Sequence, residues 1–322
     1  MLRVAFMGAL SASFAESVRA HLAVPCEILI TTETEVVSLL PEVDVLVTLV
    51  FTPAMGAAAK RLRLVQVPGA GLDRIDRSAL PPGTSLANVY GHETGIAEYV
   101  LGAMLAMSRG FGRLDAGLRV GRWESQWAPG TPPPPWPELA GRTLGILGYG
   151  HIGQALARRA RAFEMAVIAV RRDATQPDPH ATVYGPDGLG DVLARADYLA
   201  ITMPLTPATR GLIGEPELRW MKANAILINV ARAEIVDEEA LYHALAEKRI
   251  AGAALDVWYR YPAGAGPTFP ARHAFHELPN VLMTPHVSGW TDGMLEARAK
   301  LIAENIQRTA QREPPANLIA RA

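Results

Sequence analysis

The chain has 322 residues, of which 49% are hydrophobic and 20% are charged, and its formal net charge at pH 7 is −1. A chain of this length usually forms more than one domain, and a charge so near zero gives no electrostatic basis for binding nucleic acid or an anionic membrane. Cys26 is the single cysteine, which excludes an intrachain disulfide and a metal site built from several cysteines, and we expect no metal.

The opening segment, MLRVAFMGAL, is typical of a β-strand and lacks the basic n-region and cleavage site of a secretion signal. The apolar runs of the chain are much shorter than the roughly 18 residues that a membrane-spanning helix needs. We therefore expect a cytoplasmic protein that does not contact membranes.

Residues 1–97 alternate between strand-like and helix-like segments, which predicts a small parallel α/β unit. The expected helices are Phe14–Leu22 and Ala54–Arg61, and the expected strands are Arg3–Met7, Glu27–Thr31, Val43–Val50 and Leu64–Pro68. A helical stretch then runs from Ile96 to Val120, where three glycines, at 102, 110 and 117, mark close packing or breaks. The proline-rich segment 129–137, PGTPPPPWP, predicts an extended loop because proline cannot continue a helix.

Strands and helices alternate again from Thr143 to Val287, a pattern that predicts a dinucleotide-binding domain. The six expected strands are Leu144–Leu147, Val167–Val170, Tyr198–Met203, Ile226–Val230, Gly252–Asp256 and Val281–Thr284. The last predicted helix, Asp292–Arg312, is long enough to return to the first unit. We expect an α/β fold of two Rossmann- or flavodoxin-like domains with doubly wound parallel sheets. The substrate-binding domain would comprise residues 1–97 and 290–322, and the nucleotide-binding domain, residues 98–289, would be inserted in it.

Residues 144–153, LGILGYGHIG, contain a G-x-G-x-x-G fingerprint between a predicted strand and a predicted helix. In this context Gly148 forms the tight turn, Gly150 lets the pyrophosphate approach the backbone, and Gly153 lets the helix pack closely on the strand. The N–H groups at the start of the helix attract phosphate. We therefore predict that a dinucleotide contacts Gly148, Tyr149, Gly150, His151, Ile152 and Gly153.

Two arginines, Arg171 and Arg172, follow the next strand. A carboxylate about 20 residues beyond the fingerprint would bind the ribose 2′-hydroxyl of NAD, whereas arginine suits the 2′-phosphate of NADP. Arg171 stands in that position, with Asp173 two residues later as the rival candidate. The alternative is that both arginines are solvated at a strand end. We expect Arg171 and Arg172 to bind the cofactor and NADP(H) to be favoured, with NAD(H) possible.

In an open α/β sheet, ligands bind beyond the carboxyl ends of the strands, so residues that follow strands are candidates for chemistry. Here these include Arg232, Asp256 and His286. A guanidinium can hold the carboxylate and carbonyl groups of a 2-keto acid, and an imidazole can exchange a proton with the hydroxyl as hydride moves. Taken alone, each of these residues could equally be an ordinary surface residue or the end of a strand without a catalytic role. Their order behind a dinucleotide fingerprint favours a catalytic role.

These segments resemble the D-isomer-specific 2-hydroxyacid dehydrogenase family over essentially the full length of the chain. The matching segments are VPGAGLDRID at 67–76, Ala97-Glu98, the fingerprint, MPLTPATRGLIG at 203–214, NVARAEIVDEEAL at 229–241, AALDVW at 253–258 and TPHVSGWT at 284–291. The resemblance implies that Arg232 and His286 are catalytic and that Asp256 lies near the nicotinamide carboxamide. It also implies that backbone N–H groups of Gly69, Ala70 and Gly71 bind the substrate carboxylate. We further expect cofactor contacts at Met203, Pro204, Val230 and Ala231, and a homodimer formed through the helices near Ile96–Val120.

The chain departs from the family pattern at the glutamate that pairs with the histidine, because Tyr261 occupies that position. A carboxylate beside an imidazole raises its pKa, whereas a tyrosine can orient the ring by hydrogen bonding but supplies no charge. Glu277 or another acid could also take this place. Further departures are His92-Glu93, where the family commonly has asparagine, and Ala233-Glu234, which follow Arg232 in place of glycine and a small residue.

The sequence therefore predicts an oxidoreductase that interconverts a small 2-keto acid, such as glyoxylate or hydroxypyruvate, and a D-2-hydroxy acid. Arg232 would bind the substrate, His286 would be the acid–base and Tyr261 would orient His286. One alternative is a formate- or phosphite-type dehydrogenase, because formate dehydrogenases also lack the glutamate and Phe51–Ala54 resembles their loop near formate. Another is a non-catalytic, nucleotide-sensing corepressor-like protein, which the presence of both Arg232 and His286 disfavours. Loops at 48–55, 69–73 and 88–93 would set the substrate.

Overall fold

The computed structural model describes residues 1–322 and divides into two compact units. One unit comprises Met1–His92 and Trp290–Ala322, and the other, Glu93–Gly289, is inserted between these two segments. The boundary expected after residue 97 lies instead after residue 92. The reason is that helix α5 (Glu93–Arg109) begins there and already buries Ile96 and Ala97 in the core of the inserted unit.

The first unit is built on a six-stranded sheet with the order β13-β5-β4-β3-β1-β2. Five strands are parallel, in the 2-1-3-4-5 order of flavodoxin-like folds, and β13 pairs antiparallel with β5. The strands are β1 (Leu2–Met7), β2 (Cys26–Thr31), β3 (Val45–Val47), β4 (Leu64–Gln66), β5 (Ser85–Ala87) and β13 (Leu318–Arg321). The helices are α1 (Ala9–Ser13), α2 (Ala15–His21), α3 (Val36–Leu39), α4 (Pro53–Ala58) and α11 (Asp292–Gln311), with 3₁₀ turns η1 (Leu40–Glu42) and η2 (Arg77–Ala79).

Two strands of this sheet, β5 and β13, were not expected from the sequence. Strand β5 reads Ser-Leu-Ala and contains no β-branched residue, so its pattern gives little indication of a strand. The expected strand Val43–Val50 shortens to Val45–Val47, and the expected helix Phe14–Leu22 becomes α2, which follows α1 directly after Phe14.

Helix α11 is fixed to the first unit by a buried amide pair. Asn305 donates its Nδ2 hydrogen to Gln66 Oε1 at 2.7 Å, and its Oδ1 accepts from the backbone N–H of Ala316 at 2.7 Å. Both amide side chains are fully buried, and apolar residues of α11 share a hydrophobic core with Leu64 of β4. The C-terminal helix therefore belongs to the same core as β4.

The inserted unit contains a seven-stranded sheet, all parallel, with the order β12-β11-β10-β9-β6-β7-β8. Its strands are β6 (Thr143–Leu147), β7 (Ala166–Val170), β8 (Thr182–Tyr184), β9 (Tyr198–Ile201), β10 (Ile226–Asn229), β11 (Gly252–Leu255) and β12 (Val281–Met283). Counted from β6, this is the 3-2-1-4-5-6 order of dinucleotide-binding sheets with one more strand at the edge. The edge strand β8 was not expected, because its segment Thr-Val-Tyr is only partly buried and has no apolar run.

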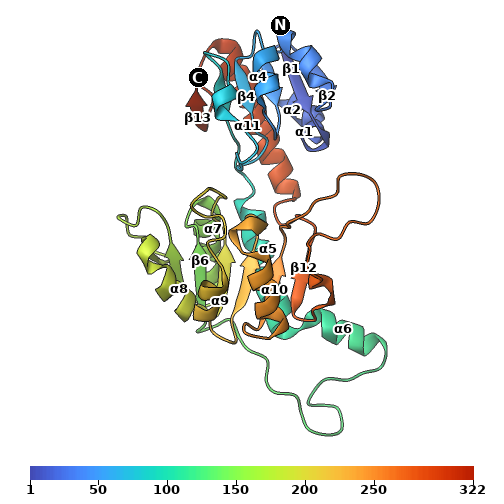
Figure 1. Cartoon of the computed structure of the whole chain (residues 1–322), viewed down its shortest axis with the longest axis vertical. Coiled ribbons are helices and arrows are strands. Elements are labelled where there is room, and N and C mark those ends of the chain that lie inside the picture. Colours follow the sequence, from blue (N-terminus) through green and yellow to red (C-terminus); the bar gives the residue numbers. More distant parts are fainter. The chain divides into compact units, whose positions relative to one another are not determined.

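Helices cover both faces of this sheet (Figure 1). Helices α5 and α7 (His151–Ala162) enclose one hydrophobic core with the sheet. The opposite core contains residues of α8 (Leu189–Arg195), α9 (Glu215–Trp220) and α10 (Glu238–Ala246). Three 3₁₀ turns complete the unit: η3 (Pro186–Gly188), η4 (Ala233–Ile235) and η5 (Phe275–Glu277). This architecture directs the carboxyl ends of β6, β9, β10 and β11 to one edge of the sheet.

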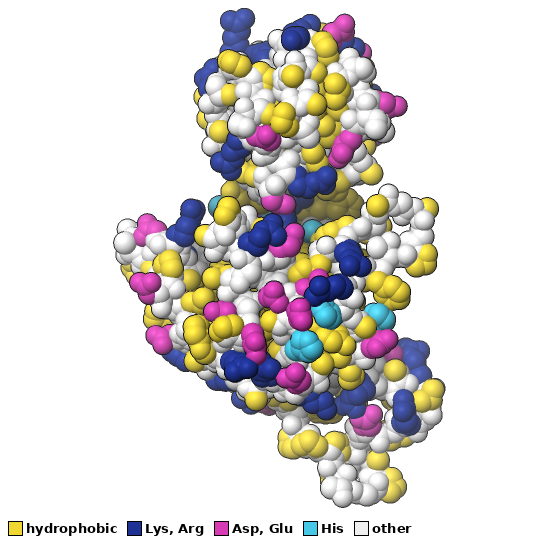
Figure 2. All heavy atoms as spheres, in the orientation of Figure 1, with side chains coloured by type: hydrophobic (Ala, Val, Ile, Leu, Met, Phe, Trp, Pro, Cys, Tyr) yellow, Lys and Arg dark blue, Asp and Glu magenta, His cyan; other side chains and the backbone are white.

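The helical stretch expected from Ile96 to Val120 is two helices. Gly110 adopts a left-handed conformation with φ 63° between α5 and α6 (Phe111–Arg119). Residues 120–137 then form a long loop that ends in the expected extended proline segment before β6. Trp123 and Trp127 on this loop are 63% and 81% exposed, and Figure 2 shows the apolar side chains along it. None of the helices combines the length and apolar character required to cross a membrane.

Candidate active site

The turn between β6 and α7 gives each fingerprint glycine a separate role. Gly148 has φ +100°, and a Cβ atom there would lie 2.5 Å from the backbone of Met203. A Cβ at Gly153 would lie 2.7 Å from the carbonyl oxygen of Gly148. A Cβ at Gly150 would meet no atom within 4 Å. Gly148 and Gly153 are therefore required by packing, whereas Gly150 borders open space that a pyrophosphate can approach.

Helix α7 begins at His151 with Gly150 as its N-cap, and no side chain caps its first turn. Its first-turn N–H groups and the positive end of its dipole suit a phosphate. Ile152 is half-buried on the turn, whereas His151 is exposed. The donor set and the open space at Gly150 thus fit the diphosphate of a nicotinamide dinucleotide.

Arg171 lies at the end of β7, where the ribose of a dinucleotide would be selected. Its Nη2 donates to the carbonyl oxygen of Gln176 at 2.8 Å, and its Nε is buried without a hydrogen-bond partner. Arg172 is exposed. Asp173 is engaged in its own turn, because its Oδ1 accepts from the hydroxyl of Thr175 at 2.7 Å.

Tyr149 of the fingerprint reaches the same loop. Its hydroxyl donates to Asp178 Oδ1 at 2.7 Å, and that oxygen also accepts from the backbone N–H of His180 at 2.8 Å. Burial, reinforced by Asp178, raises the pKa of Tyr149, so the phenol remains a hydrogen-bond donor. The loop after β7 is thereby tied to the phosphate-binding turn.

The other expected cofactor residues lie at the ends of β9 and β10. Met203 packs against Gly148, and Pro204 next to it is exposed. Val230 is buried, and the N–H of Ala231 donates to Asn229 Oδ1 at 3.1 Å. The strand order places β9 next to β6 at the switch point of the sheet, where dinucleotides bind in this kind of fold.

Arg232 follows β10, and Asn229 shapes the turn that holds it. Asn229 is buried, and its Nδ2 donates to the carbonyl oxygen of Arg232 at 2.9 Å. Arg232 is half-buried, and its Nη1 donates to the carbonyl oxygen of Ala231 at 2.7 Å. The amide side chain of Asn229 thus fixes the backbone on both sides of the residue expected to bind substrate.

His286 lies on a turn after β12 that is anchored by a buried carboxylate. Asp256 is fully buried, and it accepts hydrogen bonds from Thr284 Oγ1 at 2.6 Å and from the backbone N–H groups of Val287 and Ser288, both at 2.8 Å. His286 itself has φ 60°, a left-handed conformation that few residues other than glycine adopt. The carboxylate of Asp256 thus stabilises the His286 turn through these hydrogen bonds. Its expected position at the nicotinamide carboxamide stays a prediction.

Tyr261 contacts the imidazole of His286. Its hydroxyl lies 2.8 Å from His286 Nδ1 and 3.4 Å from the backbone N–H of Trp258. Burial raises the pKa of Tyr261, so the phenol is neutral at physiological pH. Glu277 was the alternative acid partner for His286, and its Oε1 lies 3.9 Å from Nε2 of the neighbouring His276. The position that carries glutamate in the family is thus held by a neutral hydroxyl.

The expected substrate-binding residues Gly69, Ala70 and Gly71 lie in the first unit, on the loop after β4. The carbonyl oxygen of Ala70 accepts from Asn88 Nδ2 at 3.1 Å, which fixes this loop. Two residues of the formate-type resemblance have structural roles instead. Phe51 is buried in the core, and the hydroxyl of Thr52 caps α4 by accepting from the N–H of Met55 at 3.3 Å.

Comparison with known proteins identifies the family of the chain. The family model described as "D-isomer specific 2-hydroxyacid dehydrogenase, NAD binding domain" matches residues 101–288. Hydroxypyruvate reductase from Thermotoga maritima is 34% identical over 279 residues, covering 85% of this chain and 86% of the relative. Glyoxylate reductase from Thermococcus litoralis is 36% identical over 294 residues, covering 86% and 84% of the two chains. D-3-phosphoglycerate dehydrogenase from Methanocaldococcus jannaschii is 35% identical, but this chain spans only 48% of its length.

The fold is shared as well. A D-isomer specific 2-hydroxyacid dehydrogenase family protein from Aeromonas salmonicida has a solved structure with a TM-score of 0.82 and 27% identity, covering 99% of both chains. The chain therefore belongs to the D-isomer-specific 2-hydroxyacid dehydrogenase family, as the sequence motifs indicated. Its inserted unit contains the NAD-binding domain of that family, which makes it an oxidoreductase with a nicotinamide cofactor.

Two substitutions in the fingerprint separate packing from ligand binding. Gly150→Ala meets no neighbouring atom and has φ −96°, so we expect an unchanged Tm but weaker binding of the dinucleotide. Gly148→Ala combines φ +100° with a backbone clash and should lower the Tm as well. Thermal unfolding and fluorescence titration with the reduced cofactor measure the two effects. Normal binding by Gly150→Ala would contradict the assigned phosphate site.

Proposed function

We propose that the protein interconverts a small 2-keto acid and the corresponding D-2-hydroxy acid, with glyoxylate and hydroxypyruvate as the candidate keto acids. The observation that carries this proposal is the 2.8 Å contact between Tyr261 Oη and His286 Nδ1, which orients the imidazole, and we assign the exchanging proton to Nε2. Arg232, at the end of β10 in the same sheet, supplies the positive charge that a carboxylate substrate needs. Full-length relatives named hydroxypyruvate reductase and glyoxylate reductase support the same substrate class.

In the direction of reduction, His286 donates a proton from Nε2 to the carbonyl oxygen of the keto acid. A nicotinamide dinucleotide held by the fingerprint turn, residues 148–153, would supply the hydride for reduction and would accept it in oxidation. Arg232 holds the carboxylate and polarises the carbonyl group. After the transfer the imidazole is neutral and keeps its proton at Nδ1, where it donates to Tyr261 Oη. In oxidation Nε2 takes the hydroxyl proton back.

We also propose a ligand for each unit by itself. The backbone N–H groups of Gly69, Ala70 and Gly71 in the first unit bind the substrate carboxylate, and the inserted unit binds the dinucleotide. We further propose a homodimer that covers the apolar side chains of α6 and of the loop after it. The support is their exposure, since Phe111, Leu118 and Val120 are 55%, 52% and 68% exposed.

A formate- or phosphite-type dehydrogenase is the second candidate. The observation in its favour is the neutral partner of His286, because hydride transfer from formate needs no acid–base proton. The structural roles of Phe51 and Thr52 weaken the resemblance of their loop to that branch. Turnover of a keto acid by the purified protein, compared with oxidation of formate or phosphite, separates the two.

For the cofactor, we propose a preference for NADPH. The position of Arg171 directly after β7 supports this choice, because a guanidinium fork at this strand end suits a 2′-phosphate. We expect a higher kcat/KM with NADPH than with NADH. Arg171→Asp should shift the preference toward NADH, since it removes a phosphate partner and adds a like charge. Equal use of both cofactors by the native protein would contradict the proposal.

Arg232→Ala should lower kcat/KM for a carboxylate substrate by about 10²-fold or more, because a bidentate charge-assisted contact is lost. Arg232→Lys should recover only part of the rate, since an ammonium lacks the planar fork. Affinity for the cofactor should change little in both. Steady-state kinetics with either keto acid give kcat/KM, and near-normal turnover by the alanine variant would exclude the role.

The Tyr261–His286 pair predicts a specific pH dependence. Only protonated His286 can donate in reduction, so the rate should fall as the pH rises through the pKa of His286. Tyr261→Glu places a carboxylate beside the imidazole, raises that pKa and should move the fall in rate to higher pH. Tyr261→Phe adds no charge and should lower the rate by loosening the ring. A profile for Tyr261→Glu that overlays the native profile would contradict this account.

A further inference from the structure

We propose that Tyr99, on α5, is a positioning residue for the proton transfer, because it holds the turn that presents His286. It acts through Thr284 and Asp256. The inference rests on the acid–base role proposed for His286 and adds a residue that neither the sequence motifs nor the family resemblance indicated.

A directed chain of hydrogen bonds links α5 to the buried carboxylate. Tyr99 Oη and Thr284 Oγ1 are 2.6 Å apart, and Thr284 Oγ1 donates to Asp256 Oδ1 at 2.6 Å. A threonine hydroxyl has one hydrogen, and that hydrogen is committed to the carboxylate. Tyr99 must therefore be the donor to Thr284. Burial raises the pKa of Tyr99, which keeps its hydroxyl protonated for this task.

This series of hydrogen bonds ends on the backbone of the His286 turn. Asp256 accepts from the N–H groups of Val287 and Ser288, the two residues that follow His286. The left-handed conformation of His286 is unfavourable for a residue with a Cβ atom and persists only where the surroundings enforce it. Asp256 and the groups that orient it are part of this enforcement.

Thr284 also connects the His286 turn to Tyr261 through hydrogen bonds of Trp258. Its carbonyl oxygen accepts from the indole Nε1 of Trp258 at 2.8 Å and from the N–H of His286 at 3.1 Å. The backbone N–H of Trp258 in turn lies 3.4 Å from Tyr261 Oη. A displacement of Thr284 therefore changes the contact between Tyr261 Oη and His286 Nδ1. Tyr99 is the helix residue that fixes Thr284 in place.

The same helix provides a matched control. Near the other end of α5, Ser108 Oγ and Tyr198 Oη on β9 also lie 2.6 Å apart. This pair joins α5 to the amino end of the sheet, whereas Tyr99 joins it to the carboxyl end. Tyr198→Phe removes one phenol hydroxyl from a buried contact of the same length, without a link to His286. Both substitutions keep the aromatic ring.

The test compares Tyr99→Phe with Tyr198→Phe in the full-length protein. We expect similar decreases in Tm from the two changes. Only Tyr99→Phe should lower kcat for keto-acid reduction, by about tenfold, because small misplacements of a catalytic group are costly. The KM for the cofactor should not change. Thr284→Ser, which keeps the hydroxyl, should retain most of the rate, and Thr284→Val should lose it.

A double-mutant cycle with Tyr261→Phe excludes a merely structural effect. If Tyr99 acts by fixing the Tyr261–His286 contact, then Tyr261→Phe should cost less in the Tyr99→Phe background than in the native protein. Additive losses, a native kcat for Tyr99→Phe, or an equal loss of kcat in Tyr198→Phe would overturn the proposal. Full activity of His286→Gln would instead overturn the proposed acid–base role itself.

Discussion

The buried carboxylate of Asp256 is the constraint on which the proposed site depends. A carboxylate removed from water is costly unless hydrogen bonds replace its hydration. Here the replacement comes from Thr284 and from the two N–H groups that follow His286. If the His286 turn relaxed, the charge would lose partners in a place that water does not reach. The carboxylate therefore stabilises a backbone conformation that the turn would not adopt alone, and it does so next to the imidazole that the proposed reaction requires.

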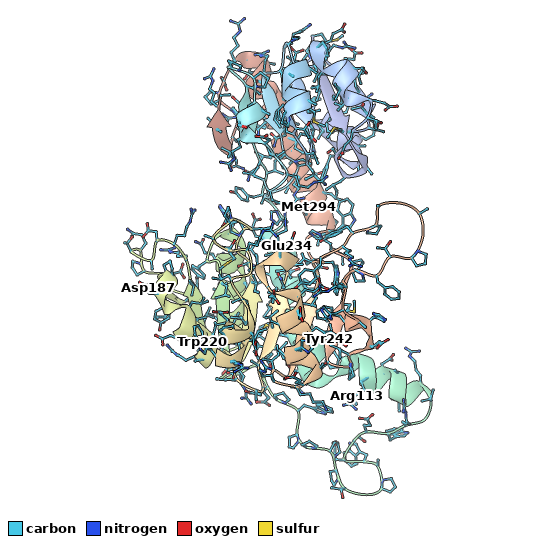
Figure 3. All side chains as sticks on the ribbon, in the orientation of Figure 1. Arg113, Asp187, Trp220, Glu234, Tyr242 and Met294 are labelled. Carbon is cyan, nitrogen blue, oxygen red and sulfur yellow. The ribbon has the colours of Figure 1, made fainter.

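The parallel sheet explains why these groups meet at one edge. Strands β6, β9, β10 and β11 are neighbours with matched directions, so the loops that follow them collect at their carboxyl ends. At β6 the backbone of Met203 approaches Gly148 so closely that a side chain is excluded. At β10 the buried amide of Asn229 shapes the turn of Arg232. Figure 3 shows Glu234 at the same edge, just beyond Arg232 in the chain, whereas Trp220 lies near the opposite edge. Close packing and buried hydrogen bonds thus hold in place the loops that carry the candidate residues at this edge.

Much of this could be predicted from the sequence, and the failures have physical reasons. Short apolar runs separated by helical segments predicted most strands of both sheets, because buried parallel strands consist almost entirely of hydrophobic residues. Strands β8 and β13 are partly exposed at the sheet edges and β5 has no β-branched residue, so their segments give a weaker pattern, and they form through pairing with neighbouring strands. Arg232 and His286 could be named because each lies in a matching segment, and Tyr261 because it occupies the position of the family's glutamate. Tyr99 could not, since its contact with Thr284 joins residues 185 positions apart and depends on how α5 packs against the sheet.

Tyrosine at position 261 changes what the histidine can do. A carboxylate only accepts hydrogen bonds, so it favours the imidazolium and confines the proton of a neutral ring to Nδ1. The Tyr261 hydroxyl can accept from a protonated Nδ1 or rotate and donate to a bare one, because its own proton is retained. The ring is then held in place in either state while no charge at Tyr261 stabilises the imidazolium. Orientation and electrostatic activation, which one glutamate combines, are separate here, and only orientation remains at this position. The contact between His286 and Tyr261 therefore depends on the geometry of the turn and not on a charge at residue 261.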